Sequence, residues 1–328
     1  MTTLSAIKVV GKVRDVAGSD ITLASDPDAV RDPATGKVVL AWHSTSGGQN
    51  VIAASETSDG AKLDGQHVVV LRPEKNSWNW QGCETPSLAP PTANLPLWTW
   101  LRSTYPNYIG DLPSPVAGRE HRWKGISMAV STTWKGPAKW VHRAPVLAPC
   151  SPSTMPYVGN DKLLDGGLDE PTHVVTGKTA FGLAAGTSYA LGQSPSLHLI
   201  GNLDLSAFGG RMWWQEPDPV LTEAPPSWVS QPDLVVHQDG RMFVLACKKL
   251  GAGEGCFLYE AEGKDLHKLT MVGTGPLVQT TTGTFYSARC FGPCGVIDGN
   301  TLRMWFSGRP TNAPGNDWHL GYAEAGLS

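Results

Sequence analysis

Residues 23–44 read LASDPDAVRDPATGKVVLAWHS, and this stretch decides the fold. A polar start with Asp26 and Asp28 leads into a short strand, RDPATGK at 31–37 forms a turn, and VVLAW at 38–42 follows as a second strand. Proline fixes φ and glycine supplies a positive φ, so Asp-Pro followed by Thr-Gly favours a turn. The stretch therefore predicts a β-hairpin with two carboxylates at the mouth of its first strand.

The same unit recurs along the chain. Five X-Pro dipeptides each precede a β-rich run: Asp26-Pro27, Thr85-Pro86, Glu170-Pro171, Gln231-Pro232 and Gly292-Pro293. Three of the four intervals between these prolines are roughly sixty residues, and the longer one contains extra Pro-, Gly- and Trp-rich sequence. A module of four short strands at such a period is typical of a β-propeller blade.

We therefore predict an all-β fold, a five-bladed β-propeller, in one domain spanning residues 1–328. Its blades are expected to begin near residues 24, 83, 169, 230 and 289, with an insertion at 90–123. The last unit has three clear strands, and AIKVVGKV at 6–13 supplies a fourth, which joins the two chain ends and removes free sheet edges. A pair of β-sandwiches is the alternative, but sandwich turns recur about every 8–12 residues without a longer period.

Composition excludes several classes of protein. The sequence is 41% hydrophobic and 17% charged, which suits one large or two ordinary globular domains. A net charge of −3 without Lys or Arg runs argues against electrostatic binding of nucleic acid. No apolar stretch approaches the roughly 20 residues that cross a bilayer. The start, MTTLSAIKVV, lacks the basic and apolar regions of a secretory signal, so we expect a cytoplasmic protein or one whose signal has been removed.

Six cysteines are too few for a disulfide scaffold of this length. Cys290 and Cys294 lie in CFGPC, but no second pair has metal-ligand spacing, so we predict no zinc site and no cofactor. A calcium ion on the propeller axis is left open. Reduced, mostly buried thiols are expected, with a Cys247–Cys256 link across a hairpin as the alternative.

Together, the units resemble the five-bladed propeller glycoside hydrolases, the family 43 arabinanase and xylosidase group and its relatives. The matching pieces are SDPDAVRDPATGKVVLAW in the first unit, ETPSL with GISMAVSTTW and PVLAP in the second, PPSWVSQPDLVV at the fourth, and VIDGNTLRMWFSG with HLGYAEA in the fifth. The resemblance covers most of the chain through short motifs. It implies cleavage of glycosidic bonds by two carboxyl groups, one giving a proton to the leaving oxygen and the other ionised.

The resemblance also implies roles for individual residues. In the family, the residue before the first blade's proline is an aspartate that acts as general base, and Asp26 matches it. The third-blade acid, which orients the other groups, corresponds to Glu170, one carbon longer than the usual aspartate. The family's proton donor is a glutamate two residues before the fourth blade's proline, where this sequence has Ser230. Glu84 stands two residues before Pro86 in the second blade and is the best replacement, so the predicted catalytic residues are Asp26, Glu84 and Glu170.

Further polar and aromatic side chains are expected around the opening of the central funnel, which we call the mouth of the propeller. In a propeller the starts of the innermost strands face a central funnel, so groups far apart in sequence converge there. Tryptophan faces stack on the apolar faces of sugars, and polar groups bind hydroxyls. The residues predicted to bind substrate are Asp28, Trp80, Asp169, His173, Gln231, Tyr286 and Arg289.

Structural explanations compete with these roles. Asx side chains bond neighbouring backbone N–H groups, so Asp26 and Asp28 can simply cap the turn. Single glutamates near strand ends are common, and in that case Glu84 and Glu170 are solvated or salt-bridged without a catalytic role. Three tryptophans within strands are expected in the core, namely Trp42, Trp213 and Trp305.

The predicted function is hydrolysis of glycosidic bonds, in particular of furanosides in arabinose-containing glycans, with inversion at the sugar. The expected partner is an oligosaccharide or polysaccharide, with no nucleic acid and no membrane, and the sequence predicts no oligomeric state. Because Ser230 and Gln231 stand where the family has its donor, two alternatives stay open. One is a propeller that binds glycans without cleaving them, and the other is a phosphorylase or lyase that uses a single carboxyl group.

Overall fold

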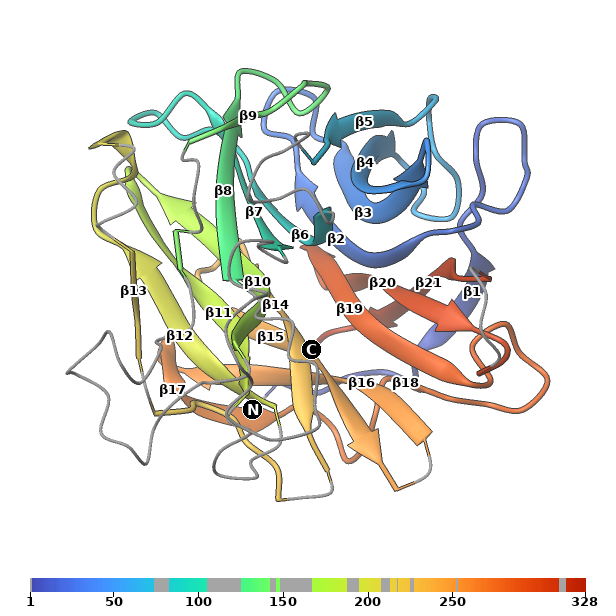
Figure 1. Ribbon diagram of the computed structural model, residues 1–328. Helices are drawn as coiled ribbons and strands as arrows, with labels where there is room; N and C mark the ends of the chain where they lie inside the picture. Colours follow the sequence, from blue (N-terminus) through green and yellow to red (C-terminus); the bar gives the residue numbers. More distant parts are fainter. Residues whose placement is uncertain are drawn as a thin grey trace, which may run out of the picture.

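The computed structural model describes residues 2–73, 83–104, 125–141, 146–147, 167–187, 195–207, 213–216, 218–224, 227–251, 253–312 and 317–328. In these residues the strands form five sheets around a common centre (Figure 1). A short 3-10 turn, η2 (Leu205–Ala207), follows one of the strands. No helix in the described ranges is long and apolar enough to span a membrane. The predicted all-β, five-bladed β-propeller is confirmed.

Each blade is a sheet of antiparallel strands. Neighbouring strands are consecutive in the chain, except that β1 pairs with β21 in blade 5 and β18 pairs with β16 in blade 4. Blade 1 contains β2 (Ser25–Arg31), β3 (Val38–Ser46), β4 (Gln49–Thr57) and β5 (Val68–Leu71); blade 2 contains β6 (Cys83–Ala89), β7 (Trp98–Thr104), β8 (Gly125–Ser131) and β9 (Lys139–Trp140). Blade 3 contains β10 (Gly167–Thr176), β11 (Thr179–Thr187), β12 (Ser196–Asn202) and β13 (Trp213–Gln215). Blade 4 contains β14 (Val229–Val236), β15 (Met242–Leu250), β16 (Gly253–Glu262) and β17 (Asp265–Met271), with β18 (Val278–Gln279) paired to β16. Blade 5 contains β19 (Arg289–Asp298), β20 (Thr301–Arg309), β21 (His319–Gly326) and β1 (Lys8–Lys12). Strand β7 lies inside the segment 90–123 that was expected as an insertion.

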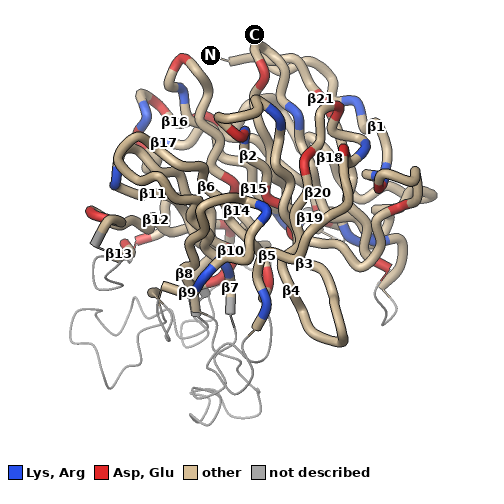
Figure 2. Tube along the Cα trace, turned by 90° about the horizontal axis from the view of Figure 1, so that it is seen from above, with Lys and Arg blue, Asp and Glu red and all other residues tan. Residues whose placement is uncertain are grey.

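The N-terminal strand completes blade 5. Strand β1 pairs antiparallel with β21, with Lys8 opposite Glu324. Beyond them, Thr3 and Ser328 exchange two backbone hydrogen bonds of 2.7 and 3.0 Å, and the two termini lie side by side (Figure 2). This confirms that residues 6–13 supply the fourth strand of the last unit.

Apolar side chains fill the spaces between neighbouring blades. The three tryptophans predicted in the core, Trp42, Trp213 and Trp305, are all buried. The cysteines of the described ranges are also buried, and they are free thiols. Cys247 and Cys256 face each other across β15 and β16 without a disulfide.

The five innermost strands share one local distortion. Each one shifts its register by one residue at its X-Pro dipeptide. The residue before each proline has a positive φ: Asp26 (49°), Thr85 (42°), Glu170 (52°), Gln231 (50°) and Gly292 (59°). A left-handed backbone conformation costs a non-glycine residue about 1–3 kcal/mol, and residues in this conformation are enriched at functional sites. A β-bulge also breaks the regular alternation of side chains along the strand. Every blade thus has a bulge and a left-handed residue at the same position, near the start of its inner strand.

In blades 1 to 4, the residue after the proline ties neighbouring blades together. Its side chain accepts a hydrogen bond from a backbone N–H of the next blade, in the pairs Asp28 with Leu88, Ser87 with His173, Thr172 with Leu234, and Asp233 with Gly295. The same bond therefore repeats from blade 1 to blade 5. Together with the bulges, it fixes the inner strands in one register around the axis.

Candidate active site

Gln231 of blade 4 bonds to three other blades at the mouth of the propeller. Its Nε2 donates to Oδ1 of Asp26 at 2.7 Å, and its Oε1 accepts from the N–H of Gly292 at 2.6 Å. Its own backbone N–H donates to Oε2 of Glu170 at 2.9 Å. These bonds bring Asp26 of blade 1 and Glu170 of blade 3 to the same ring, as the repeat register predicted.

Asp26 accepts hydrogen bonds at both carboxyl oxygens. Oδ1 receives the Gln231 amide, and Oδ2 receives the Ser25 hydroxyl at 2.7 Å. The backbone N–H of Asp26 donates to Oγ of Ser307 at 2.7 Å, which anchors the left-handed residue to blade 5. Two donors thus hold the Asp26 carboxyl group in one orientation at the mouth.

His43 of β3 lies between two acids. Its Nδ1 is 3.1 Å from Oγ of Ser25 and 3.8 Å from Oδ2 of Asp26. Glu84 is held beside it by Asn50, whose Nδ2 donates to Oε1 at 3.0 Å. Burial lowers the pKa of His43, but hydrogen bonding and the negative charges of Asp26 and Glu84 outweigh it and raise the pKa above the usual 6.5. The mouth thus contains an acid–imidazole–acid cluster.

Glu170 and Asp169 lie next to this cluster on blade 3. The backbone N–H of Glu170 donates to Oγ of Ser103 at 2.8 Å and to Oδ1 of Asp169 at 2.9 Å. Both acids are half-buried. The structure therefore brings Asp26, Glu84, Asp169, Glu170 and Gln231 to one mouth, from four of the five blades.

Asp28 and His173 do not lie at the mouth where the sequence predicted them. Asp28 is 4% exposed, and its carboxyl group is bonded to the Leu88 N–H and to Asp233. His173 is 3% exposed, and both of its ring nitrogens are within hydrogen-bond distance of buried hydroxyls. Burial lowers its pKa to about 3, so the ring is neutral. The bulge turns the side chains that follow the proline into the propeller interior, and this corrects the expectation for both residues.

Tyr286 and Arg289 both belong to the start of blade 5, but only Arg289 borders the mouth. The ring of Tyr286 is buried and packs edge-on against two phenylalanines. Arg289 donates to Glu254 at 2.7 Å, and its guanidinium lies 4.9 Å from the ring centre of Phe291. Because Phe291 directly precedes Gly292, Arg289 lies at the rim of the ring, whereas Tyr286 is a core residue.

His43 and its bond to Ser25 were not predicted from the sequence. A regular register counted back from the hairpin turn puts Ser44 opposite Ser25, but the bulge shifts the pairing by one residue and brings His43 there. A strand register that includes one bulge at each X-Pro dipeptide would have predicted the pairing of Ser25 with His43. Trp80, another predicted site residue, lies outside the described residues.

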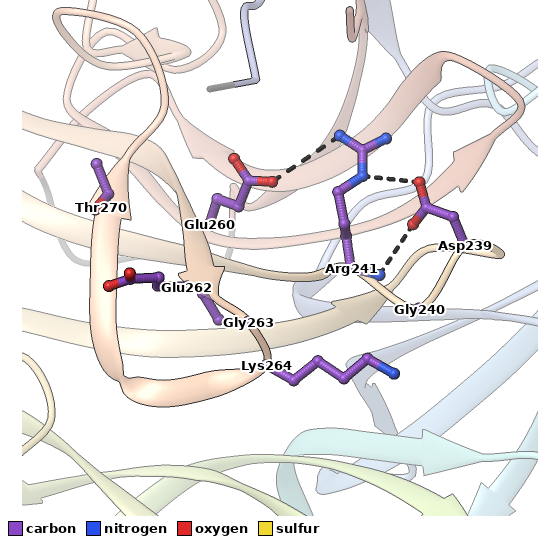
Figure 3. Close-up of a pocket in the computed structure, with 9 residues that line it drawn as sticks. Asp239, Gly240, Arg241, Glu260, Glu262, Gly263, Lys264 and Thr270 are labelled. Atoms are coloured by element: carbon purple, nitrogen blue, oxygen red, sulfur yellow. Dashed lines mark hydrogen bonds and ion pairs between the residues drawn. The ribbon is translucent and has the colours of Figure 1, made fainter.

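The mouth gathers acidic and imidazole side chains from several blades. In the residues that the structure covers, no three His, Cys, Asp or Glu side chains are arranged to hold a metal ion. A hollow of about 560 Å³ is lined by hairpin residues of blade 4 (Figure 3). There Arg241 pairs with Asp239 at 2.8 Å and lies 3.9 Å from Glu260, so these opposite charges are matched. That hollow offers no group prepared for acid–base chemistry.

Gly292 is the blade 5 member of the ring, and we expect its replacement by alanine to disturb the mouth. A Cβ there would lie 3.3 Å from Oγ of Ser307 and 3.4 Å from Cα of Asp26. The control is Gly299, whose φ of 57° is nearly the same but whose Cβ would meet nothing within 4 Å. Left-handed strain costs about 1–2 kcal/mol in either variant. Thermal unfolding should show a larger loss for Gly292→Ala, and equal losses would contradict crowding at Asp26.

No protein-family model matches this sequence, and a search of curated proteins gives no match either. Solved structures do match. One named glycoside hydrolase has a TM-score of 0.68 at 10% identity, covering 97% of this chain and 92% of that one. The α-L-arabinofuranosidase PaAbf62A from Podospora anserina, in complex with cellotriose, has a TM-score of 0.60 at 12% identity, with 99% and 96% covered. Zg3597, a family 117 glycoside hydrolase of the marine bacterium Zobellia galactanivorans, has a TM-score of 0.59 at 14% identity, with 99% and 90% covered. This chain therefore shares the fold of these proteins over nearly its whole length.

Proposed function

We propose that this protein is a glycoside hydrolase whose active site is the mouth of the propeller. The observation that supports this most is the bonding of Gln231 to both Asp26 and Glu170, with Glu84 beside the same cluster. Glycoside hydrolysis needs two carboxyl groups at one bond, and acids from three blades meet this need. The solved glycoside hydrolases with the same fold support the same class of enzyme.

In this proposal, Asp26 is the general base of an inverting reaction. It takes a proton from a water molecule as the water oxygen bonds to the anomeric carbon, while the glycosidic C–O bond breaks and the leaving oxygen receives a proton from an acid. Gln231 and Ser25 orient the carboxylate by holding one oxygen each. Arabinofuranosides are the proposed substrates, because an α-L-arabinofuranosidase shares the fold.

Glu84 is the proposed proton donor. Ser230 occupies the position where the resemblance implied a glutamate, and a hydroxyl group is too weak an acid for this role. Glu84 lies half-buried at the mouth, and its Oε1 accepts a hydrogen bond from Asn50. Glu170 is the alternative donor, although one of its oxygens is already bonded to the Gln231 N–H.

Replacing Glu84 by glutamine should slow substrates with poor leaving groups far more than activated aryl glycosides. The loss of general acid help is about 10²–10⁴-fold for an alkyl glycoside and less than about tenfold for a nitrophenyl glycoside, which departs with little protonation. Steady-state kcat on both substrates of one sugar measures this, with the exposed Glu262→Gln as the matched control. Equal slowing of both substrates removes Glu84 as donor and makes Glu170 or Asp169 the candidate.

The function itself is tested with a panel of aryl furanosides, aryl pyranosides and polysaccharides, each with and without phosphate. We expect hydrolysis without phosphate, with NMR showing the inverted anomer as the first product. Turnover only with phosphate would favour a phosphorylase. Retained glycan binding without any turnover would favour a binding propeller, the function that Ser230 and Gln231 suggest.

A further inference from the structure

We propose that His43 is a positioning residue of the mouth, whose charged imidazolium is the counter-ion of Asp26 and must stay protonated for the site to work. Its effect on catalysis rests on the proposed function. The charge cluster itself can be measured without any substrate.

The hydrogen bonds of β2 put a proton on Nδ1 of His43. The Ser25 hydroxyl has one proton, which it donates to Oδ2 of Asp26. Its oxygen is 3.1 Å from Nδ1 of His43 and can only accept there, so Nδ1 is the donor. The chain from His43 through Ser25 to Asp26 thus runs in one direction and orients the carboxylate of the proposed base.

The surroundings of Nε2, the other ring nitrogen of His43, favour a second proton on the imidazole. Nε2 is buried and has no hydrogen bond of standard geometry in the described part of the chain. Beside the ring, Asn50 uses its Nδ2 to donate to Glu84, so its remaining polar atom is a carbonyl oxygen, which accepts from a protonated imidazole. Because Nε2 is buried, the ring acts through Asp26 and Glu84 and not on the substrate directly.

His43 is also the cation that this mouth requires. The groups that face it are Asp26 and Ser25 on β2, Asn50 on β4 and Glu84 on β6. They comprise two carboxyl groups and two neutral side chains. Within the described ranges, no lysine or arginine forms an ion pair with Asp26, and His43 lies 3.8 Å from it. Without the imidazolium, the Asp26 carboxylate would lack a counter-ion at the place where it must hold a water molecule.

The sign of the pH dependence follows from the raised pKa of His43. The folded protein holds this proton to a higher pH than the unfolded chain does. The cluster therefore stabilises the fold fully below the unfolded pKa of about 6.5, and this stabilisation is lost as the pH rises through the folded pKa. In the enzyme, the alkaline limb of the kcat profile then belongs to His43.

The first test is an NMR titration of the imidazole signals in the intact protein. We expect His43 to titrate above 6.5, and at lower pH in both Asp26→Asn and Glu84→Gln, because each amide keeps the shape and removes one negative charge. His319 is the internal control, since its pKa is lowered by burial and by Lys12 and it has no bond to the cluster. A His43 pKa below 6.5, or one that Asp26→Asn leaves unmoved, overturns the proposal even if the protein cleaves no glycoside.

The second test is kinetic and uses His43→Gln, whose amide can still donate to Ser25. A misplaced catalytic group costs about 10²-fold, so we expect a loss of that size in kcat, little change in KM and disappearance of the alkaline limb. The matched control is His319→Gln, which should keep the limb and the rate. If His43→Gln instead keeps the alkaline limb and loses stability equally at every pH, His43 has a merely structural role and the proposal is wrong. Should this variant fail to fold, the titration of the carboxylate variants decides.

Discussion

Asp26→Asn should lower kcat by about 10²–10⁴-fold on every substrate, because it removes the proposed general base. The asparagine oxygen can still accept a hydrogen bond from Gln231 or Ser25, and the left-handed φ of 49° suits asparagine better than most residues. The fold should therefore stay intact. Steady-state kinetics measure the loss, and circular dichroism with thermal unfolding verifies the fold.

The control for this experiment is Asp204→Asn. Asp204 lies after β12 of blade 3, and its carboxylate bonds to Lys178 and Ser206 at the surface. We expect this variant to keep its kcat. Full activity in Asp26→Asn would remove the base from the mechanism, and the glycan-binding alternative would then take precedence.

The fold was predictable because its signals are local and repeated. Asp-Pro with Thr-Gly in residues 31–37 is turn chemistry that needs no distant partner, and the five X-Pro dipeptides mark the inner strands. The same dipeptides place the residues that face one another at the mouth, which is why Asp26, Glu170 and Gln231 were identified together from sequence. Ring closure by β1 followed from counting strands in the last unit.

The interior of the site was not predictable because the bulge changes the alternation of side chains. In a regular strand, residues two apart share a face, so Asp28 was expected to face the funnel just below Asp26. The left-handed residue and the proline break this pattern, and Asp28 points into the interior. The same one-residue shift puts His43 instead of Ser44 opposite Ser25. Backbone conformation of this kind is set by the packed ring of five blades, not by any one hairpin.

Below the mouth, the bulges create a buried carboxyl pair that the sequence did not suggest. Asp28 of blade 1 and Asp233 of blade 4 are 4% and 5% exposed and are hydrogen-bonded to each other. Asp233 also accepts from the Gly295 N–H at 2.8 Å and from the Thr172 hydroxyl at 3.2 Å. Burial raises the pKa of both groups, and the charge of Asp233 raises that of Asp28 further. Burial thus favours the protonated form of the pair in the folded state.

Asp233→Asn should invert the pH dependence of stability at this pair. The raised pKa values mean that the folded protein binds more protons than the unfolded chain above the ordinary pKa of about 3.9, so the wild-type protein loses stability as the pH rises through the folded values. Asparagine carries no titrating proton; its NH₂ group can donate to ionised Asp28, and its oxygen can accept from Gly295. The free energy of unfolding of the variant minus that of the wild type should therefore increase with pH, by up to about 1.4 kcal/mol per pH unit, and become positive at alkaline pH.

Urea unfolding from pH 4 to pH 9 measures the difference. Asp204→Asn should show a nearly constant difference above about pH 5, because hydrogen bonds to Ser206 and Lys178 lower the pKa of Asp204 and its titration lies below the ordinary value of about 3.9. Parallel curves for wild type and Asp233→Asn would mean that the pair shares no proton.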